Sequence, residues 1–315
     1  MPLTLDDIRE ASERIKLYVH RTPVWTNESL NKLVNAEVYL KCENLQKVGA
    51  FKFRGACNAV FSLSDKEAAR GVSTHSSGNH AQALALAAKL RGIPAYIVMP
   101  KNAPKVKKAA VAEYGGHITY CEPTLESRES TLARIAQETG ATIIHPYDNE
   151  RVIVGQGTAA LELLEDLPDL DVIIAPVGGG GLISGTAIAA KGLNDRIRVI
   201  AGEPEMADDA FRSIQAGEII PAMNLKTIAD GLLTSLGKIT FPIIQQYVEQ
   251  IVTVSEAAIT ESMRFIWERT KLLIEPSAAV AVAVLLEKKV NVSGSKIGVI
   301  LSGGNVDLEK LPWQA

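Results

Sequence analysis

The sequence predicts an α/β fold whose parallel sheets are covered by helices on both faces. Two observations support this prediction. Apolar, β-rich runs alternate with segments of helical periodicity through most of the chain. One such run, Asp171–Val177, leads through four consecutive glycines into a helical segment, Leu182–Lys191, as a βα unit of a parallel sheet does. Right-handed crossovers should connect these strands.

The individual elements follow from the same alternation. Thr4 with Asp7 marks the start of a first helix. The predicted strands are Glu37–Lys41, Gly71–His75, Ala95–Met99, His117–Cys121, Thr142–His145, Asp171–Val177, Val199–Gly202, Ile251–Val254 and Ile297–Leu301. The predicted helices between them include His80–Leu90, Lys105–Tyr114, Ser127–Glu138, Thr158–Glu165 and Glu256–Thr270.

The length of 315 residues suffices for two domains with sizeable cores. Residues 71–148 form a compact βαβα series, which predicts a small domain inserted into a larger one made of residues 1–70 and 149–315. The sequence shows no Pro/Gly/Ser-rich linker, low-complexity tract or short-period repeat.

Composition and charge exclude several classes of partner. The net charge is −3 and there is no basic block, so nucleic acid is not expected to bind. No apolar run approaches the roughly 18 residues of a membrane span, and the first residues lack the pattern of a secretory signal. Cys42, Cys57 and Cys121 are odd in number and widely spaced, so we expect buried free thiols in a cytoplasmic protein.

Three glycine-bearing loops follow three of the predicted strands: Ser76-Ser77-Gly78-Asn79-His80, Gly178-Gly179-Gly180-Gly181 and Ser302-Gly303-Gly304-Asn305. A strand–glycine–helix junction presents free backbone amides and the positive end of a helix dipole, which suits a phosphate. Loops at the carboxyl ends of parallel strands meet in one cleft. The three loops therefore predict one cleft for a phosphorylated planar molecule. A dinucleotide fits poorly, because Ser184 or Ile183 stands where the third glycine of its fingerprint belongs.

Lys52 is the second unusual feature, because it lies between two phenylalanines in Gly49-Ala-Phe-Lys-Phe-Arg-Gly55. A partly dry, aromatic setting lowers the pKa of a lysine and makes its amine nucleophilic, as Schiff-base chemistry requires. A phosphate cradle and a nucleophilic lysine together point to pyridoxal phosphate.

With these residues the chain resembles the fold-type II pyridoxal-phosphate enzymes of the serine racemase and serine/threonine dehydratase family. The resemblance extends from Arg21-Thr-Pro-Val24 to Ser302-Gly-Gly-Asn-Val-Asp-Leu308, and is strongest to the eukaryotic type of serine racemase. It rests on specific strings, namely Thr74-His-Ser-Ser-Gly-Asn-His80, Gly92-Ile-Pro-Ala-Tyr-Ile-Val98, Tyr120-Cys-Glu-Pro123, Glu126-Ser-Arg-Glu129, Trp267-Glu-Arg269 and Lys271-Leu-Leu-Ile-Glu-Pro276. It implies a tryptophan synthase β-like fold of two open, three-layer parallel-sheet domains with the cofactor cleft between them. The large domain would bind the cofactor, the small domain the substrate, and the protein would be a homodimer.

The resemblance also implies a role for each residue of the cleft. Lys52 would bind the cofactor and move the Cα proton on one face, while Phe51 would pack on the ring. Asn79 would bond the ring hydroxyl and Ser302 the pyridine nitrogen. The phosphate would be held by Gly178, Gly179, Gly180, Gly181 and Leu182. The substrate carboxylate would be held by Ser76, Ser77, Gly78, Asn79 and His80. His80 would also pack or cap its helix, and Glu275 would orient the side of the ring.

Ser77 bears on the reaction, because racemisation needs an acid or base on each face of the substrate. Its hydroxyl could serve the face opposite Lys52. The resemblance thus implies conversion of L-serine to D-serine, or β-elimination to a 2-oxo acid and ammonia. Two alternatives stay open at this point: a threonine or threo-3-hydroxyaspartate dehydratase with little racemase activity, and a non-catalytic sensor that binds amino acids.

Two further sites are implied by the resemblance. Glu203, Asp209 and the carbonyl of Ala207 match a divalent-cation loop, which suits Mg²⁺ or Ca²⁺, with Mn²⁺ as a further candidate. Lys47, Gln82 and Tyr114 match a nucleotide site. The run Thr26-Asn27-Glu28 departs from the Thr-Ser-Ser run of the family near that site, and an acid beside a phosphate disfavours ATP as an effector.

Overall fold

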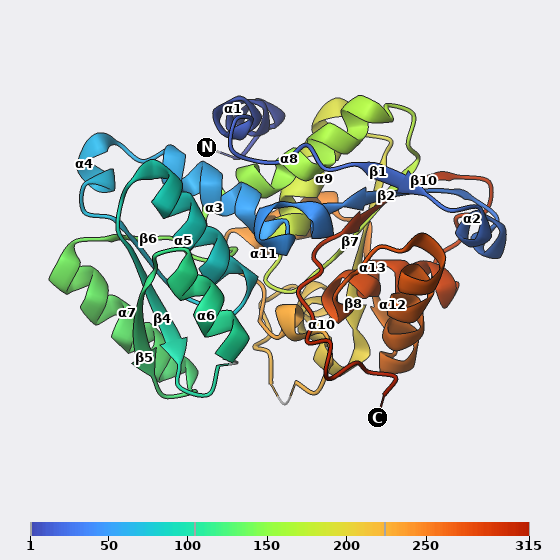
Figure 1. Ribbon diagram of the computed structural model, residues 1–315. Helices are drawn as coiled ribbons and strands as arrows, with labels where there is room; N and C mark the ends of the chain where they lie inside the picture. The colour runs from blue at the N-terminus through green and yellow to red at the C-terminus, as the bar shows by residue number, and fades with distance from the viewer. Residues whose placement is uncertain (1, 104, 224, 315) are drawn as a thin grey trace.

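The computed structural model describes residues 2–103, 105–223 and 225–314, and it contains two sheets with helices on both faces of each (Figure 1). The larger sheet has the strand order β1-β2-β10-β7-β8-β9, and the smaller one β5-β4-β3-β6. In Figure 1 the smaller sheet lies at the left, in the green part of the chain, and the larger sheet at the right. The predicted α/β class is confirmed.

The larger sheet is parallel except at one edge. Its strands are β1 (Val24–Thr26), β2 (Glu37–Cys42), β7 (Val172–Pro176), β8 (Arg198–Pro204), β9 (Gln250–Val254) and β10 (Lys296–Leu301). β1 runs antiparallel to β2, with Trp25 opposite Leu40. The sequence analysis did not predict β1, because three residues are too few to show a strand pattern.

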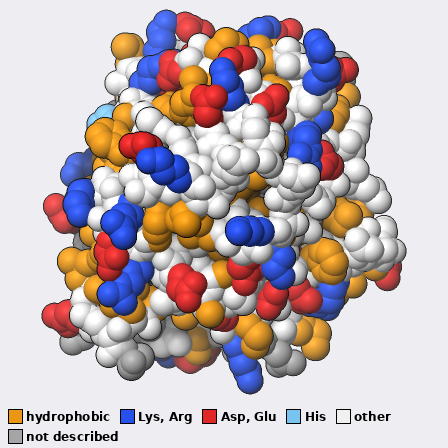
Figure 2. Space-filling view, turned by 90° about the vertical axis from the view of Figure 1, so that its right-hand side faces the viewer, with side chains coloured by type: hydrophobic (Ala, Val, Ile, Leu, Met, Phe, Trp, Pro, Cys, Tyr) orange, Lys and Arg blue, Asp and Glu red, His pale blue; other side chains and the backbone are white. Residues whose placement is uncertain are grey.

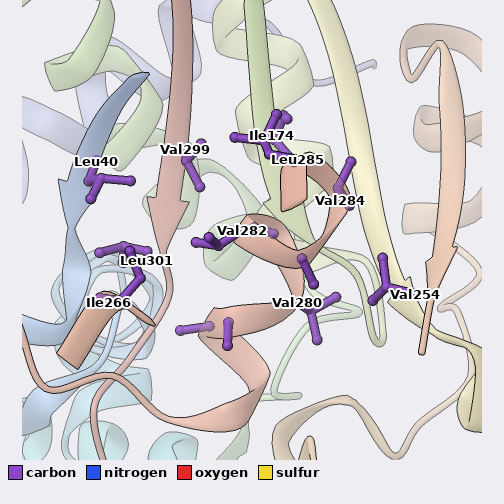
Figure 3. Close-up of a cluster of buried hydrophobic side chains, with 14 of the residues drawn as sticks. Leu40, Ile174, Val254, Ile266, Val280, Val282, Val284, Leu285, Val299 and Leu301 are labelled. Carbon is purple, nitrogen blue, oxygen red and sulfur yellow. The ribbon is translucent and has the colours of Figure 1, made fainter. Parts of the chain in front are cut away.

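Helices pack on both faces of this sheet. One face is covered by α2 (Glu28–Val34), α12 (Glu256–Thr270) and α13 (Pro276–Leu286). The other is covered by α1 (Leu5–Ile15), α8 (Glu150–Asp166), α9 (Gly181–Leu193), α10 (Asp209–Ala216) and α11 (Thr240–Tyr247). Figure 3 shows how Val280, Val282 and Val284 of α13 form one buried cluster with Ile174 and Val299 of the sheet. This cluster fixes the strands whose ends carry the glycine loops.

The smaller sheet is entirely parallel. It consists of β3 (Val72–His75), β4 (Ala95–Pro100), β5 (His117–Cys121) and β6 (Thr142–Ile143). α5 (Asn79–Arg91) and α6 (Lys105–Glu113) cover one face, and α7 (Leu125–Thr139) covers the other. α3 (Lys52–Phe61) packs between α5 and α8 and so joins the two parts of the molecule, while the short α4 (Asp65–Ala68) leads from α3 to β3. All strands of this sheet fall within residues 71–148, but the domain boundaries themselves stay a prediction.

The largest error in the sequence-based elements concerns α8, which begins at Glu150 and not at Thr158. Gly155 and Gly157 lower helix propensity and obscured the first two turns. The structure shows why glycines stand there. A Cβ on Gly155 would lie 2.7 Å from Cα of Gly55, and one on Gly157 would lie 2.8 Å from the carbonyl oxygen of Gly185. Close packing of α8 on α3 and α9 therefore outweighs the propensity.

The surface agrees with the absence of a basic block in the sequence. On the face shown in Figure 2, lysine and arginine side chains are interspersed with aspartate and glutamate. Within the described residues, no helix combines the length and apolar character that crossing a bilayer requires. Cys42, Cys57 and Cys121 are buried free thiols, as expected.

Candidate active site

The carboxyl ends of strands from both sheets face one cavity of about 820 Å³, a size typical of small-molecule sites. The cavity is lined by residues of all three glycine-bearing loops and by Lys52. The structure therefore brings together the segments that the sequence analysis assigned to one cleft. Their individual roles remain proposals.

Lys52 is the first residue of α3 and is partly buried. Its Nζ lies 5.1 Å from the ring centroid of Phe51 and donates a hydrogen bond to the carbonyl oxygen of Pro146 at 2.9 Å. Loss of solvent lowers the pKa of Lys52 to about 8, while the Glu275 carboxylate acts in the opposite direction. A large fraction of the amine is therefore neutral near pH 8, as a nucleophile or base requires.

A buried ion cluster holds α3 in place. Arg54 lies two residues after Lys52 and is fully buried. Its guanidinium donates to the carboxylates of Glu43 and Glu162 at 2.7–2.8 Å, and Lys41 also contacts Glu162 at 2.6 Å. The two positive charges of the cluster, on Lys41 and Arg54, thus balance its two negative charges, on the two glutamates. The cluster connects α3 with β2 and α8, which fixes the start of the helix that carries Lys52.

The tetraglycine loop lies between β7, which ends at Pro176, and α9, which begins at Gly181. Gly180 has a φ of 91°, which side chains rarely tolerate. A Cβ on Gly179 would lie 2.3 Å from the ring of Tyr147, so the backbone approaches this ring closely. The first amides of α9 have no partners within the helix, and Gly181 and Leu182 line the cavity. These features suit a bound phosphate.

The Ser76–Asn79 loop forms a second wall of the cavity. It connects β3 to α5, and a Cβ on Gly78 would meet no atom within 4 Å. Ser77 lies on this open segment and lines the cavity. Asn79 donates to the Glu275 carboxylate at 3.0 Å and accepts from Asn305 at 2.9 Å. This wall therefore presents hydroxyl and backbone groups to the cavity.

Ser302 and His80 complete the predicted set. Ser302 is buried at the end of β10, and its carbonyl accepts a hydrogen bond from the amide of Phe51. His80 pairs through Nε2 with the carbonyl of Ile144 at 3.2 Å. Burial lowers the pKa of His80 to about 3, so the ring is neutral. Its packing or capping role and its place in the substrate site both stay predictions.

The sequence analysis missed several residues that line the cavity. Tyr147 packs on the glycine loop, and Arg128 presents a guanidinium whose Nε has no hydrogen-bond partner among the described residues. Lys107 of α6 forms an ion pair with Asp230 at 2.7 Å. Tyr147 could have been found from the sequence, because it follows the predicted strand Thr142–His145 and so lies at the same sheet edge as the other loops.

The candidate cation loop follows β8. The carboxylate of Glu203 accepts from the amides of Ala210 and Phe211 at 2.7 and 2.8 Å. Both carboxylate oxygens of Asp209 are buried without a hydrogen-bond partner, and burial raises its pKa to about 7 and that of Glu203 to about 8. A divalent cation would compensate such orphaned oxygens, so these residues fit one. The described residues contain no group of three or more His, Cys, Asp or Glu side chains that could hold a metal, so a carbonyl such as that of Ala207 would have to contribute.

The three candidate nucleotide residues lie around the core of the smaller sheet. Nζ of Lys47 lies 5.7 Å from the ring centroid of Phe53, Gln82 is buried in α5, and Tyr114 packs against the same core. Glu28 opens α2 and pairs with Lys32 at 2.6 Å. None of these contacts shows whether a nucleotide binds at these residues.

Comparison with known proteins places this cleft in a family. A β-hydroxyaspartate dehydratase of Paracoccus denitrificans is 52% identical over 98% of both chains. An L-threo-3-hydroxyaspartate ammonia-lyase of Saccharomyces cerevisiae is 49% identical over 98% of this chain and 94% of its own length. The crystal structure of the serine racemase of Dictyostelium discoideum covers 97% of this chain and 99% of its own, with 52% identity and a TM-score of 0.94. Residues 15–303 match the family described as "Pyridoxal-phosphate dependent enzyme". The chain belongs to this family of pyridoxal-phosphate dependent enzymes.

Proposed function

We propose that the protein acts on L-serine and related 3-hydroxy amino acids, by racemisation at Cα or by β-elimination to a 2-oxo acid and ammonia. The observation that supports this most directly is the position of Lys52. A partly buried amine with a pKa of about 8 lies in one cavity with a glycine-rich anion cradle and an open, hydroxyl-bearing loop. The names of the relatives support the same two reactions.

The residues of the cavity would bind the cofactor, bind the substrate and transfer protons. Pyridoxal phosphate, when bound, supplies the covalent link to the substrate amine and the electron withdrawal that makes the Cα proton acidic. Gly178–Gly181 and Leu182 would hold its phosphate, Phe51 and Asn79 its ring, and Ser302 its nitrogen. Lys52 would bind it covalently and, once displaced, take the Cα proton. Ser76–His80 would hold the substrate carboxylate, and Ser77 would return a proton on the opposite face.

The acidic substrate 3-hydroxyaspartate is favoured by a specific observation. Arg128 lines the cavity and its Nε lacks a partner among the described residues, so it could receive a second carboxylate. Lys107 already pairs with Asp230 and is less available. The dehydratase alternative therefore stays open, whereas the enzymatic relatives and the position of Lys52 argue against a non-catalytic sensor.

One experiment separates these activities. The holoenzyme is incubated with L-serine, L-threonine and threo-3-hydroxyaspartate, and 2-oxo acid and D-amino acid are measured in the same samples. We expect product from at least one of them. Arg128→Met should reduce the turnover of hydroxyaspartate by about 100-fold, because the charge-assisted bidentate contact with its second carboxylate is lost. The turnover of serine should fall far less. Failure of all three substrates would refute the proposal.

We further propose a structural divalent cation held by Glu203, Asp209 and Ala207, a homodimeric assembly, and a cytoplasmic location. The cation is supported by the orphaned oxygens of Asp209. The location is supported by three free thiols. Light scattering coupled to gel filtration tests the dimer. We propose no nucleotide effector, because Glu28 disfavours a phosphate.

A further inference from the structure

Residues 145–148, called here the Pro146 loop, connect β6 of the smaller sheet to α8 of the larger one. The function proposed above gives this loop no task. Yet the carbonyl oxygen of Pro146 accepts the hydrogen bond from Nζ of Lys52 at 2.9 Å. A backbone carbonyl thus holds the amine that the reaction depends on, and its position is set by the rest of the loop.

The loop is tied to a second segment, residues 234–239, by side chains that follow Pro146. The hydroxyl of Tyr147 lies 2.6 Å from Oγ1 of Thr234. The carboxylate of Asp148 accepts from the amides of Lys238 and Ile239 at 3.1 and 2.7 Å. Three hydrogen bonds therefore restrain the two residues directly after the carbonyl.

Contacts within the loop and with the glycine cradle add to this restraint. The amide of Asp148 donates to Nδ1 of His145 at 3.0 Å, and the ring of His145 meets that of Tyr147 edge to face at 4.5 Å. The Tyr147 ring in turn packs against the backbone of Gly179. The carbonyl that faces Lys52 is therefore fixed relative to the cradle for the cofactor phosphate.

We propose that the carbonyl of Pro146 holds the ε-amino group of Lys52 during Cα proton transfer, and that Tyr147 and Asp148 are positioning residues that act through this carbonyl. The inference rests on the proposed function. In the step, the neutral amine takes the Cα proton, the electrons of the broken C–H bond stay with the substrate, and the new ammonium donates to Pro146. Return of the proton reverses the transfer.

The surroundings of Lys52 explain why such an acceptor matters. Desolvation disfavours the ammonium, so a fixed carbonyl dipole offsets part of that penalty. The other titratable groups that act electrostatically with Lys52 are Glu275, His80 and His145. Burial lowers the pKa of the two histidines to about 3 and about 4, so neither offers a negative charge. Pro146 and Glu275 are thus the groups that stabilise the ammonium.

The test removes the hydrogen bond between Tyr147 and Thr234, by substituting either one of these two residues. Tyr147→Phe and Thr234→Val each delete the hydrogen bond between these two side chains and leave the two bonds of Asp148 to residues 238 and 239 in place, and the double variant deletes nothing more. With L-serine deuterated at Cα, we expect each variant to cleave the Cα bond about fivefold more slowly, the size of one lost hydrogen bond. The isotope effect on kcat should rise, and the double variant should be no slower than either single one. Tyr120→Phe, at an exposed tyrosine of β5, is the matched control and should change neither quantity.

A second readout does not require turnover. The cofactor-free protein is mixed with pyridoxal phosphate over a range of pH, and the rate at which Lys52 captures it is followed by visible absorbance. A less well-held ammonium has a lower pKa, so the midpoint of the rate against pH should move to lower pH in both variants. Unchanged midpoints would overturn the proposal.

A slowing of Tyr147→Phe alone would also overturn it, since the hydroxyl would then act on the substrate and not through Thr234. The failure of the proposed function is a separate outcome. In that case the wild type would turn over none of the 3-hydroxy amino acids, while the capture experiment would still report on Lys52. Thermal unfolding of each variant shows whether it is folded. If Tyr147→Phe does not fold, the comparison with the wild type is made with Thr234→Val.

Discussion

The two walls of the cleft differ in how tightly they are packed. On the larger sheet, the tetraglycine loop is pressed against Tyr147, and Gly180 requires a left-handed backbone. On the smaller sheet, Gly78 faces open space. A wall without room for one extra carbon suits a ligand that stays in place, and an open wall suits one that enters and leaves. The difference supports the proposal that the larger sheet anchors the cofactor while the smaller sheet meets the substrate.

Lys52 lines the same cavity as both walls, and its replacement should have the largest effect. Lys52→Ala removes the residue proposed both to attach the cofactor and to act as the base, so we expect activity to fall at least about 1,000-fold with every substrate. The visible band of the lysine-bound cofactor should vanish. Lys52→Arg, which keeps the charge but cannot deprotonate, is the control and should be equally inactive. Substantial activity in either variant would remove Lys52 from the mechanism.

The contrast between the walls is tested directly by two matched glycine variants. Gly179→Ala places a methyl group 2.3 Å from the Tyr147 ring and should displace the loop. We expect the affinity for pyridoxal phosphate to fall about 10- to 100-fold, since overpacking typically costs about 1–3 kcal/mol. Gly78→Ala should leave cofactor affinity within about twofold and act on KM for the substrate. The contrast fails if Gly78→Ala releases the cofactor as readily as Gly179→Ala.

The same two regions show what could be predicted from the sequence. The glycine loops and the strands before them were recognisable, because a buried parallel strand is a continuous apolar run with a glycine turn at its end. The contacts that give these loops their properties were not, because they join distant residues. Tyr147 meets Gly179, and Arg54 meets Glu162, only after the chain has folded. The start of α8 was missed for the same reason, as its glycines serve packing against α3 and α9.

On the open wall, Ser77 should decide between the two reactions. Ser77→Ala removes the proposed proton donor for one face of the substrate and leaves Lys52, the proposed base for the other face, intact. We expect formation of D-serine to fall about 100-fold or more, and elimination from L-serine to change by less than about tenfold. Chiral chromatography and 2-oxo acid detection in one reaction give the ratio. If the ratio is unchanged, Ser77 only binds the carboxylate.

The smallest effect concerns the cation loop, because none of its three candidate ligands lines the cavity. In the metal-free protein the pKa values of Asp209 and Glu203 are raised to about 7 and about 8. Between the unfolded pKa values near 4 and these folded ones, the native state binds more protons than the unfolded state. Stability should therefore fall as pH rises through this window.

A cation needs the deprotonated carboxylates, so Mg²⁺ should raise the unfolding temperature more at about pH 8 than at about pH 6. Asp209→Asn should abolish this difference, whereas Asp208→Asn, at a carboxylate paired with Arg212, should keep it. Equal stabilisation at both pH values, or its survival in Asp209→Asn, would place the cation elsewhere.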